Sequence, residues 1–334
     1  MNKVIKLASR PTGKPTDKNF KFSEEERPEA SEGEILLKTI YVSVDPYLRG
    51  RMSEGKSYIP PFEVGKPIAS GIIAEVIESK HKDFEKGEYV SGMLEWKQYQ
   101  VSDGKDLNKA DKNLAPLSAF LGVLGMTGLT AYFGLTKIGE PEKGETLVVS
   151  GAAGAVGSTV GQIGKILGMK VVGIAGSDEK ISMIKEKFGY DEGINYDTTD
   201  DMAAAINKAC PDGVDVYFDN VGGEISDGVM KNINKFARIV NCGAISLYNE
   251  TEMPTGPRPE VFLIKNSAKM QGFIIGDFQD RFPEGVQQLG QWLKEGKLTY
   301  EETIREGFDN IPKAFLELFE GKNKGKMLVK VAED

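Results

Sequence analysis

The chain has 334 residues, which predicts about two domains, because compact domains average roughly 150 residues. Hydrophobic residues make up 40% and charged residues 28% of the chain, which excludes a disordered protein, and the net charge of −8 offers no basic surface for nucleic acid or anionic lipid. Two cysteines and one histidine exclude a disulfide framework and leave too few ligands for zinc, so we expect a cytoplasmic protein without a metal.

The N-terminal part of the chain is predicted to be mostly β-structure. Short strand patterns separated by turns with Gly and Pro occur at residues 33–44, 71–79, 87–93 and 96–102. The start of the chain carries charges throughout and lacks the apolar segment of a secretion signal, so we expect no export.

An uncharged stretch at residues 113–136 is long enough to span a membrane. Its glycines, its threonines, Pro116 and the lack of basic or aromatic anchors argue against a span. We therefore expect no membrane segment and interpret the stretch as a buried helix between two domains.

From Thr146 onward, β-branched runs alternate with amphipathic stretches, the pattern of successive βαβ units. Strands are predicted at Thr146–Ser150, Lys170–Ala175, Gly193–Tyr196, Val214–Asn220, Ala237–Gly243 and Lys269–Ile275. Helices are predicted at Ala155–Gly168, Asp178–Phe188, Asp200–Ala209 and Gly223–Asn234. Such short right-handed crossovers pack on a parallel sheet. The expected fold class is therefore α/β, with a doubly wound parallel sheet of six strands.

The C-terminal segment, residues 298–331, predicts a strand, a helix that begins near Asn310 and Pro312, and a final strand. A segment this small does not fold alone, so we expect it to complete the N-terminal β domain. The predicted substrate domain then consists of residues 1–124 and 294–334. A nucleotide-binding domain, residues 125–293, is inserted in it, with the ligand cleft between the two.

The strongest local motif is the glycine-rich turn between the first strand of the α/β domain and the helix that follows. A pyrophosphate binds at such a helix N-terminus because backbone N–H groups and the helix dipole favour an anion, and Cβ atoms would block its approach. The pattern GAAGAVG has alanine in place of the usual second glycine, and a tight structural turn is the weaker alternative. The residues expected to bind the dinucleotide phosphates are Gly151, Ala153, Gly154, Ala155, Val156 and Gly157.

The end of the second strand indicates which dinucleotide is bound. An NAD site usually places an acidic side chain there on the ribose 2′-hydroxyl, but this chain has Gly176 and Ser177, which leave that space vacant. Lys180 can reach a 2′-phosphate as a point charge, and Tyr196 can donate its hydroxyl. This pattern favours NADP (NADPH) over NAD. The alternative is that Lys180 is a solvated helix residue beside the two carboxylates that precede it.

Small or polar residues end the fourth and fifth predicted strands as well. Ligands of open α/β sheets bind at the carboxyl edge, so Asn220, Val221, Cys242 and Gly243 are expected to border the ribose and the nicotinamide. We interpret Cys242 as a packing residue rather than a reactive thiol, because no histidine or other base is available to activate it.

The shortage of zinc ligands and of histidine disfavours ketone–alcohol interconversion. Conjugate reduction asks less of the protein, because hydride goes to the β-carbon of an enone and only the enolate oxygen needs a hydrogen-bond donor. A tyrosine keeps its proton at neutral pH, and one positioned donor contributes on the order of 3 kcal/mol to the transition state. Tyr248 and Tyr47 are the candidate catalytic residues.

Several blocks in order resemble the zinc-independent medium-chain dehydrogenases/reductases, and within them the prostaglandin and leukotriene reductases, plant double-bond reductases and bacterial curcumin reductases. The blocks cover nearly the full length: DPYLRGRM, GMTGLTAYFGL, SGAAGAVGS, AGSDEK, NYD, YFDNVGG, NCGAISLYN, QGFII and GKNKGKMLVK. The resemblance implies a GroES-like β domain, a Rossmann domain, NADPH as cofactor and a homodimer.

The resemblance also implies roles for single residues. Lys180 and Tyr196 would bind the 2′-phosphate. Tyr248 would adjoin the nicotinamide ribose and the substrate carbonyl, and Tyr47 would line the substrate pocket. Thr127, also assigned to the cofactor site, stands at the pocket rim where some relatives carry proline, which bears on the substrate range. The residues implied to lie by the nicotinamide are Phe273, Ile274 and Asn323.

Together these features predict an NADPH-dependent reductase of the C=C bond of small hydrophobic α,β-unsaturated aldehydes and ketones. Two alternatives stay open. One is a quinone reductase of the same superfamily, and the other is a nucleotide-binding protein that serves in sensing with little turnover.

Overall fold

The computed structural model describes residues 1–55, 57–252 and 254–333. By its internal contacts the chain divides into two units. The first unit contains Met1–Leu121, Glu302–Asn323 and the residues from Met327 onward, and the second contains Gly122–Glu301 and Lys324–Lys326. The domain limits given above stay a prediction of the sequence.

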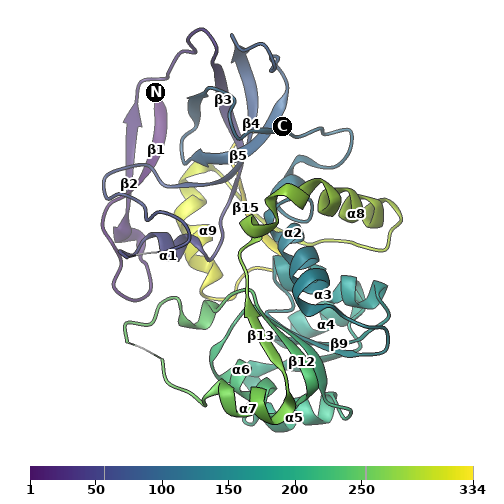
Figure 1. Cartoon of the computed structure of the whole chain (residues 1–334). Helices are drawn as coiled ribbons and strands as arrows, with labels where there is room; N and C mark the ends of the chain where they lie inside the picture. Colours follow the sequence, from purple (N-terminus) through teal and green to yellow (C-terminus); the bar gives the residue numbers. More distant parts are fainter. Residues whose placement is uncertain (56, 253, 334) are drawn as a thin grey trace. The chain divides into compact units, whose positions relative to one another are not determined.

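The second unit is built on a six-stranded parallel sheet of order β10-β9-β8-β11-β12-β13. Figure 1 labels β9, β12 and β13 of this sheet. Its strands are β8 (Thr146–Ser150), β9 (Lys170–Ala175), β10 (Glu192–Asn195), β11 (Val214–Asp219), β12 (Ile233–Asn241) and β13 (Lys269–Gly272). This order, 3-2-1-4-5-6 by appearance, is that of a Rossmann fold and confirms the predicted sheet. The winding reverses between β8 and β11, so ligands are expected at the carboxyl ends of these two strands.

Helices cover both faces of this sheet. The helices of this unit are α2 (Met126–Phe133), α3 (Ala155–Ile166), α4 (Asp178–Phe188), α5 (Met202–Ala209), α6 (Gly223–Met230), α7 (Pro259–Asn266) and α8 (Phe282–Lys294), of which α8 packs on α2. Val148 and Tyr217 pack with side chains of α5, α6 and α7 in one buried cluster. The neighbouring residue Leu147 is also buried and points to the opposite face, because side chains alternate along a strand, and α3 packs against β8 and β9.

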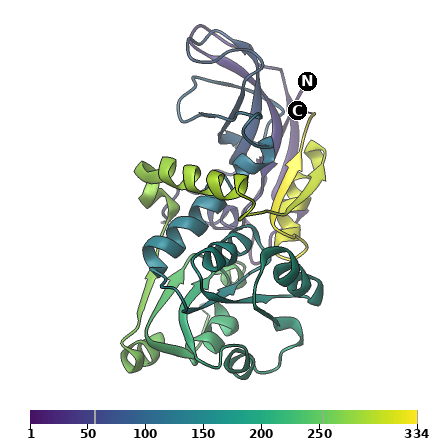
Figure 2. The ribbon, with the colours of Figure 1, turned by 90° about the vertical axis from the view of Figure 1, so that its right-hand side faces the viewer.

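The first unit is mostly β-structure, as predicted. Its main sheet has the order β14-β15-β3-β4-β5-β7, β6 pairs with β3, and β1 pairs with β2 separately. The strands are β1 (Asn2–Leu7), β2 (Phe20–Glu25), β3 (Ile35–Ser43), β4 (Ala69–Ser79), β5 (Tyr89–Glu95), β6 (Tyr99–Ser102), β7 (Asn108–Lys109), β14 (Glu302–Glu306) and β15 (Lys326–Lys330), with helices α1 (Leu48–Arg51) and α9 (Ile311–Leu318). Figure 2 shows the C-terminal strands in yellow against the N-terminal strands in purple, and β15 pairs antiparallel with β3.

The uncharged stretch at residues 113–136 forms short helical segments instead of one long helix. These are η2 (Leu117–Leu121), α2 and the π-helical turn η3 (Gly134–Gly139). Most of α2 is buried, which confirms a buried helix, although it is shorter than the stretch suggested. Within the described ranges, no helix is long and apolar enough to cross a membrane.

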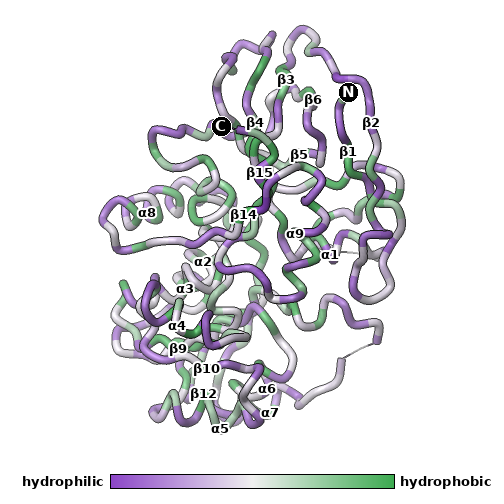
Figure 3. The backbone as a smooth tube through the Cα atoms, turned by 180° about the vertical axis from the view of Figure 1, so that it is seen from behind, coloured by the Kyte–Doolittle hydropathy of each residue, from purple (hydrophilic) through white to green (hydrophobic). Residues whose placement is uncertain are grey.

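Several predicted boundaries are wrong. The predicted helix over Gly223–Asn234 ends at Met230, because Ile233 already pairs with Val214 in the sheet. The last predicted strand ends at Gly272. Helices α7 and α8 were not predicted. Each has a proline in its first turn, and hydrophilic and hydrophobic residues alternate along α8 (Figure 3).

Candidate functional site

The glycine-rich turn joins the end of β8 to the start of α3. Gly151 has a φ of 60°, a left-handed conformation that favours glycine. A Cβ on Gly157 would overlap the carbonyl oxygen of Gly151 and lie 2.8 Å from the Cα of Ala152. No side chain of the described residues caps this end of α3. The first backbone N–H groups of α3 are therefore the donors that an anion can reach at this turn.

Gly176 and Ser177 lead from β9 into α4. The Ser177 hydroxyl caps α4 by accepting a hydrogen bond of 3.2 Å from the backbone N–H of Lys180. The sequence suggested that the space beside Gly176 is vacant. In the structure it is occupied, because the Tyr196 hydroxyl lies 2.5 Å from the place of a Cβ on Gly176. Burial lowers the pKa of Lys180 and raises the pKa of Tyr196. The fold thus gathers the end of β9, the first turn of α4 and Tyr196.

Both carboxylates in the first turn of α4 have partners. Asp178 accepts a hydrogen bond of 2.8 Å from the side-chain amide of Asn195. Glu179 forms an ion pair with Lys324, which reaches it from the C-terminal part of the chain. Asp178 and Glu179, the two carboxylates that left the choice between NAD and NADP open, are therefore paired with other side chains.

Asp219 organises the switch point between β8 and β11, a role that the sequence did not reveal. Its side chain is 3% exposed, and its Oδ1 accepts hydrogen bonds from the Ser150 hydroxyl (2.7 Å) and from the backbone N–H groups of Val221 and Gly222 (both 2.9 Å). Asn220 adds a bond of 2.7 Å from its amide to the Ser150 carbonyl. These bonds tie the carboxyl ends of the two strands together. The sequence signal available for Asp219 was a carboxylate at the end of a mostly apolar strand.

A cavity of about 460 Å³ lies at the carboxyl ends of β11 and β12. Its lining residues are Asp219, Gly222, Gly223, Ser226, Asp227, Met230, Asn241, Cys242, Gly243, Ala244, Tyr248, Pro257, Pro259, Phe262 and Met270. The structure therefore brings together three residues predicted from the sequence, Cys242, Gly243 and Tyr248, at one cavity of the second unit.

Tyr248 follows the short turn η5 (Ile245–Leu247) and faces the cavity. Its hydroxyl oxygen accepts a hydrogen bond of 3.3 Å from the backbone N–H of Ala244. Burial raises the pKa of the phenol, so it keeps its proton at neutral pH. Because the oxygen is the acceptor of the Ala244 bond, the phenolic proton remains a donor for another group.

Cys242 lies in the same cavity wall. Burial, with a smaller contribution from the Asp219 charge, raises the pKa of the thiol to about 12. The thiol is therefore protonated at neutral pH, and its protonated form is a poor nucleophile.

Three further predicted residues of the second unit lie in other surroundings. Thr127 is 6% exposed, and its hydroxyl donates to the carbonyl oxygen of Gly122 at 3.0 Å. Phe273 packs edge-on against Phe218, with ring centroids 6.5 Å apart. Ile274, beyond the end of β13, is 37% exposed.

Tyr47 and Asn323 belong to the first unit. Tyr47 precedes α1, and its hydroxyl lies 3.9 Å from the sulfur of Met93. Burial, followed by the Asp45 charge, raises the pKa of Tyr47. Tyr47 is thus a protonated donor at neutral pH, like Tyr248.

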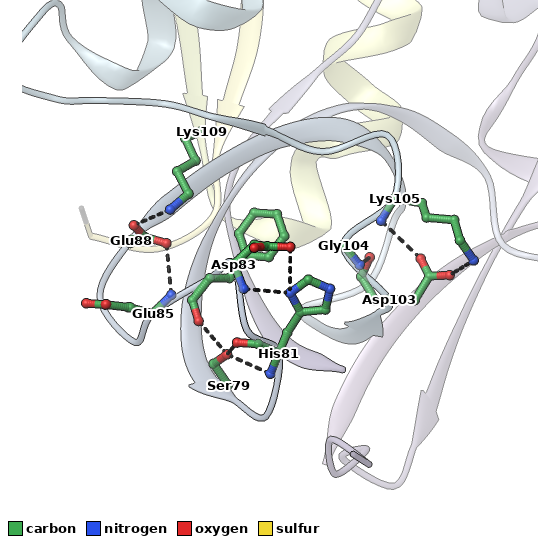
Figure 4. A network of polar contacts seen from close by, with 11 residues as sticks. Ser79, His81, Asp83, Glu85, Glu88, Asp103, Gly104, Lys105 and Lys109 are labelled. Atoms are coloured by element: carbon green, nitrogen blue, oxygen red, sulfur yellow. Dashed lines mark hydrogen bonds and ion pairs between the residues drawn. The ribbon is translucent and has the colours of Figure 1, made fainter. Parts of the chain in front are cut away.

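The only histidine, His81, lies in the turn between β4 and β5 (Figure 4). Its Nδ1 accepts a hydrogen bond of 3.1 Å from the backbone N–H of Asp83, and its ring packs against Phe84. Nearby ion pairs join Asp103 to Lys105 and Glu88 to Lys109 (Figure 4). The histidine thus has a structural role in this turn. Among residues 1–55, 57–252 and 254–333, no cluster of three or more His, Cys, Asp or Glu could hold a metal ion.

Comparisons with known proteins agree with this architecture. Residues 3–110 match the family described as the N-terminal domain of oxidoreductase, and residues 155–291 match the zinc-binding dehydrogenase family. The NADPH-dependent curcumin reductase of Escherichia coli is 46% identical over 98% of this chain and 96% of its own. The NADP(+)-dependent 2-alkenal reductase of Nicotiana tabacum is 40% identical over 100% and 98%.

A solved structure also matches the whole chain. CurA of Vibrio vulnificus in complex with NADPH superimposes with a TM-score of 0.95 at 45% identity, covering 99% of this chain and 100% of that one. The motifs, the strand order and these identities agree over nearly the full length. The protein belongs to the zinc-independent medium-chain dehydrogenases/reductases, a family of oxidoreductases.

Proposed function

We propose that this protein is an NADPH-dependent reductase of the C=C bond of small hydrophobic α,β-unsaturated aldehydes and ketones. The observation that carries the proposal is the cavity at the carboxyl edge of the sheet, which presents the protonated phenol of Tyr248 beside the switch point. The names of the E. coli and tobacco relatives, a curcumin reductase and a 2-alkenal reductase, support the same class of substrate.

The cofactor fits the residues that surround the switch point. The glycine-rich turn from Gly151 to Gly157 offers backbone N–H groups to the pyrophosphate where Cβ atoms would block it. Lys180 and Tyr196 lie at the end of β9, where the 2′-phosphate of NADPH binds in this fold. The NADPH complex of the Vibrio relative supports this assignment. Other residues proposed to contact the cofactor are Thr127, Asn220, Val221, Cys242, Gly243, Phe273, Ile274 and Asn323.

When bound, the reduced nicotinamide would supply a hydride to the β-carbon of the substrate, and a proton from solvent would reach the α-carbon of the resulting enolate to complete the reduction. Tyr248 then acts on the substrate oxygen, on which negative charge develops. Its hydroxyl donates a hydrogen bond there, and one such donor is worth on the order of 3 kcal/mol in the transition state. The Ala244 N–H donates to the phenolic oxygen. It stabilises the negative charge that this oxygen gains when its own hydrogen is engaged in the bond to the substrate, and so strengthens Tyr248 as a hydrogen-bond donor.

Part of the cavity lining is apolar and suits a hydrocarbon chain. It includes Met230, Pro257, Phe262 and Met270, which offer no hydrogen bonds from their side chains to a polar ligand. Burial of apolar substrate surface on such a lining is favourable by roughly 25 cal/mol per Å².

Tyr47 of the first unit is the second proposed hydrogen-bond donor, since burial keeps its phenol protonated as well.

A parallel assay tests this proposal. NADPH consumption is followed with a 2-alkenal, an enone, a quinone and a saturated aldehyde. We expect turnover of the 2-alkenal and the enone and no turnover of the saturated aldehyde. Turnover of the quinone alone would replace the proposal by a quinone reductase, and no NADPH consumption with any of them would contradict it.

A further inference from the structure

A short piece of the C-terminal part of the chain is anchored to the glycine-rich turn. The backbone N–H of Gly325 donates to the carbonyl oxygen of Ala153 at 2.8 Å, and Gly325 forms a parallel bridge with Gly154. Gly325 has a φ of 62°, and a Cβ there would overlap the carbonyl oxygen of Glu301. Only glycine therefore fits this position. The contact fixes the backbone from which the neighbouring Lys324 extends.

Lys324 extends to the first turn of α4. Its ammonium group pairs with Glu179, a carboxylate whose side chain is 72% exposed, while Lys324 itself is 37% exposed. The next residue, Lys180, is the one proposed to bind the 2′-phosphate, and the charge of Lys324 lies close enough to lower the pKa of Lys180 further. Two ammonium groups thus lie near one helix start, and the Tyr196 hydroxyl lies next to Gly176, which leads from β9 into that helix.

Glu179 competes only weakly with a phosphate for the ammonium group of Lys324. Exposed ion pairs contribute little to stability, because water solvates both groups well. A phosphate monoester carries close to two negative charges and three acceptor oxygens, and bonds between charged groups are about twice as strong as neutral ones. A phosphate at this place would also relieve the repulsion between the two lysines.

We propose that Lys324 is a second cationic ligand of the 2′-phosphate and a determinant of the preference for NADPH over NADH. On binding, its ammonium group exchanges Glu179 for the phosphate. This inference rests on the proposed function, because it assumes that the chain binds an NADP dinucleotide. It assigns a direct role in cofactor recognition to a residue 145 positions beyond Glu179 in the sequence.

The first test compares Lys324→Gln with Lys322→Gln. Lys322 lies two positions away and pairs with Glu320 at 2.6 Å, so its substitution makes the same charge change without touching α4. Dissociation constants for NADP⁺, NAD⁺ and 2′,5′-ADP are measured by calorimetry at low ionic strength. We expect Lys324→Gln to weaken NADP⁺ and 2′,5′-ADP at least about tenfold, and NAD⁺ less than about twofold. Lys322→Gln should change none of them, and Lys324→Arg should retain most of the affinity.

The second test separates direct binding from neutralisation of Glu179. Glu179→Gln should tighten NADP⁺ by roughly two- to fivefold, because the competing ion pair is gone. If Lys324 contacts the phosphate, Lys324→Gln still weakens NADP⁺ about tenfold in the Glu179→Gln background. If Lys324 only neutralises Glu179, its substitution has no effect in that background, and the inference is overturned.

The outcomes distinguish this inference from the proposed function. If the unmodified protein fails to bind NADP⁺, the proposed function itself fails. If it binds NADP⁺ and Lys324→Gln binds it equally well, only the role of Lys324 is lost. Equal weakening of NADP⁺ and NAD⁺ in Lys324→Gln also overturns the inference, because it indicates distortion of the glycine-rich turn through Gly325 rather than loss of a phosphate ligand.

Discussion

At the scale of single residues, the proposed chemistry depends most on Tyr248. We expect Tyr248→Phe to lower kcat on the order of 100-fold, the equivalent of the roughly 3 kcal/mol contributed by one positioned donor. The Kd for NADPH should change far less. Tyr89→Phe, in the first unit, is the matched control and should leave kcat unchanged. An unchanged kcat in Tyr248→Phe would remove this residue from the mechanism.

The pH dependence of kcat follows from the same residue. Burial raises the pKa of Tyr248 above its usual value near 10, and the active form is the protonated one. The donor is therefore present at every pH below that raised pKa and is lost only above it. We expect kcat to be flat between about pH 6 and 9 with respect to this group. A loss of activity near pH 8 that disappears in Tyr248→Phe would contradict this assignment.

Cys242 provides a second prediction at this scale. With a pKa of about 12, less than about one thiol in a thousand is ionised at pH 8. We expect iodoacetamide to label Cys242 in the folded protein far more slowly than in the protein unfolded in urea, as followed by mass spectrometry. Labelling in the folded protein at the rate of a free thiol would mean that Cys242 is a reactive residue and not a packing residue.

At the scale of elements, the bond set around Asp219 joins β8 to β11. Asp219→Ala would leave the Ser150 hydroxyl and the backbone N–H groups of Val221 and Gly222 without their acceptor. We expect the free energy of unfolding to fall by about 3 kcal/mol, since buried groups left unpaired cost roughly 1–3 kcal/mol and charged ones more. Urea unfolding measures this change, and a loss below about 0.5 kcal/mol would mean that other groups replace the carboxylate.

Alanine substitutions of two helical glycines are expected to change stability in opposite directions. Gly157→Ala at the start of α3 places a Cβ 2.8 Å from the Cα of Ala152, so we expect lower stability and weaker NADPH binding. Gly290→Ala in the middle of α8 meets nothing nearer than a Leu124 methyl at 4.0 Å. It should raise the free energy of unfolding by about 0.8–1 kcal/mol, because alanine is the better helix former. Thermal unfolding distinguishes the two, and equal effects would contradict the geometry described here.

The elements that the sequence predicted well are those whose signals are local. Strands β8 and β9 coincide with their predicted residues because each is a β-branched run ended by a small residue, and α4 does so because Ser177 caps it and Gly189 ends it. The end of α6 was mispredicted because pairing between β11 and β12 overrides local helix preference. Helix α8 was missed although its signal is local, because Val286, Leu289 and Leu293 recur at helical spacing behind a proline in the first turn.

At the scale of the whole molecule, the difference between local and long-range signals also decides which residues of the candidate site the sequence can indicate. The sequence predicts a cofactor role for the glycine-rich turn, Lys180 and Tyr196 because each follows a predicted strand at a characteristic position. The sequence does not reveal the contacts of Asp219 and Lys324, because the bond from Ser150 to Asp219 spans 69 positions and the pair of Lys324 with Glu179 spans 145. The local sequence marks Asp219 only as a carboxylate at a strand end, and it does not reveal which distant groups either side chain binds. The homodimer and the cytoplasmic location stay predictions of the sequence.

The destination of the hydride tests the central claim most directly. The protein is given a 2-alkenal and NADPH that carries deuterium in the transferred position of C4, and the product is analysed by mass spectrometry and NMR. The account predicts a saturated aldehyde with one deuterium on the β-carbon, formed in step with NADPH oxidation. An allylic alcohol with deuterium on the former carbonyl carbon would contradict it, because carbonyl reduction, not conjugate reduction, would then be the reaction.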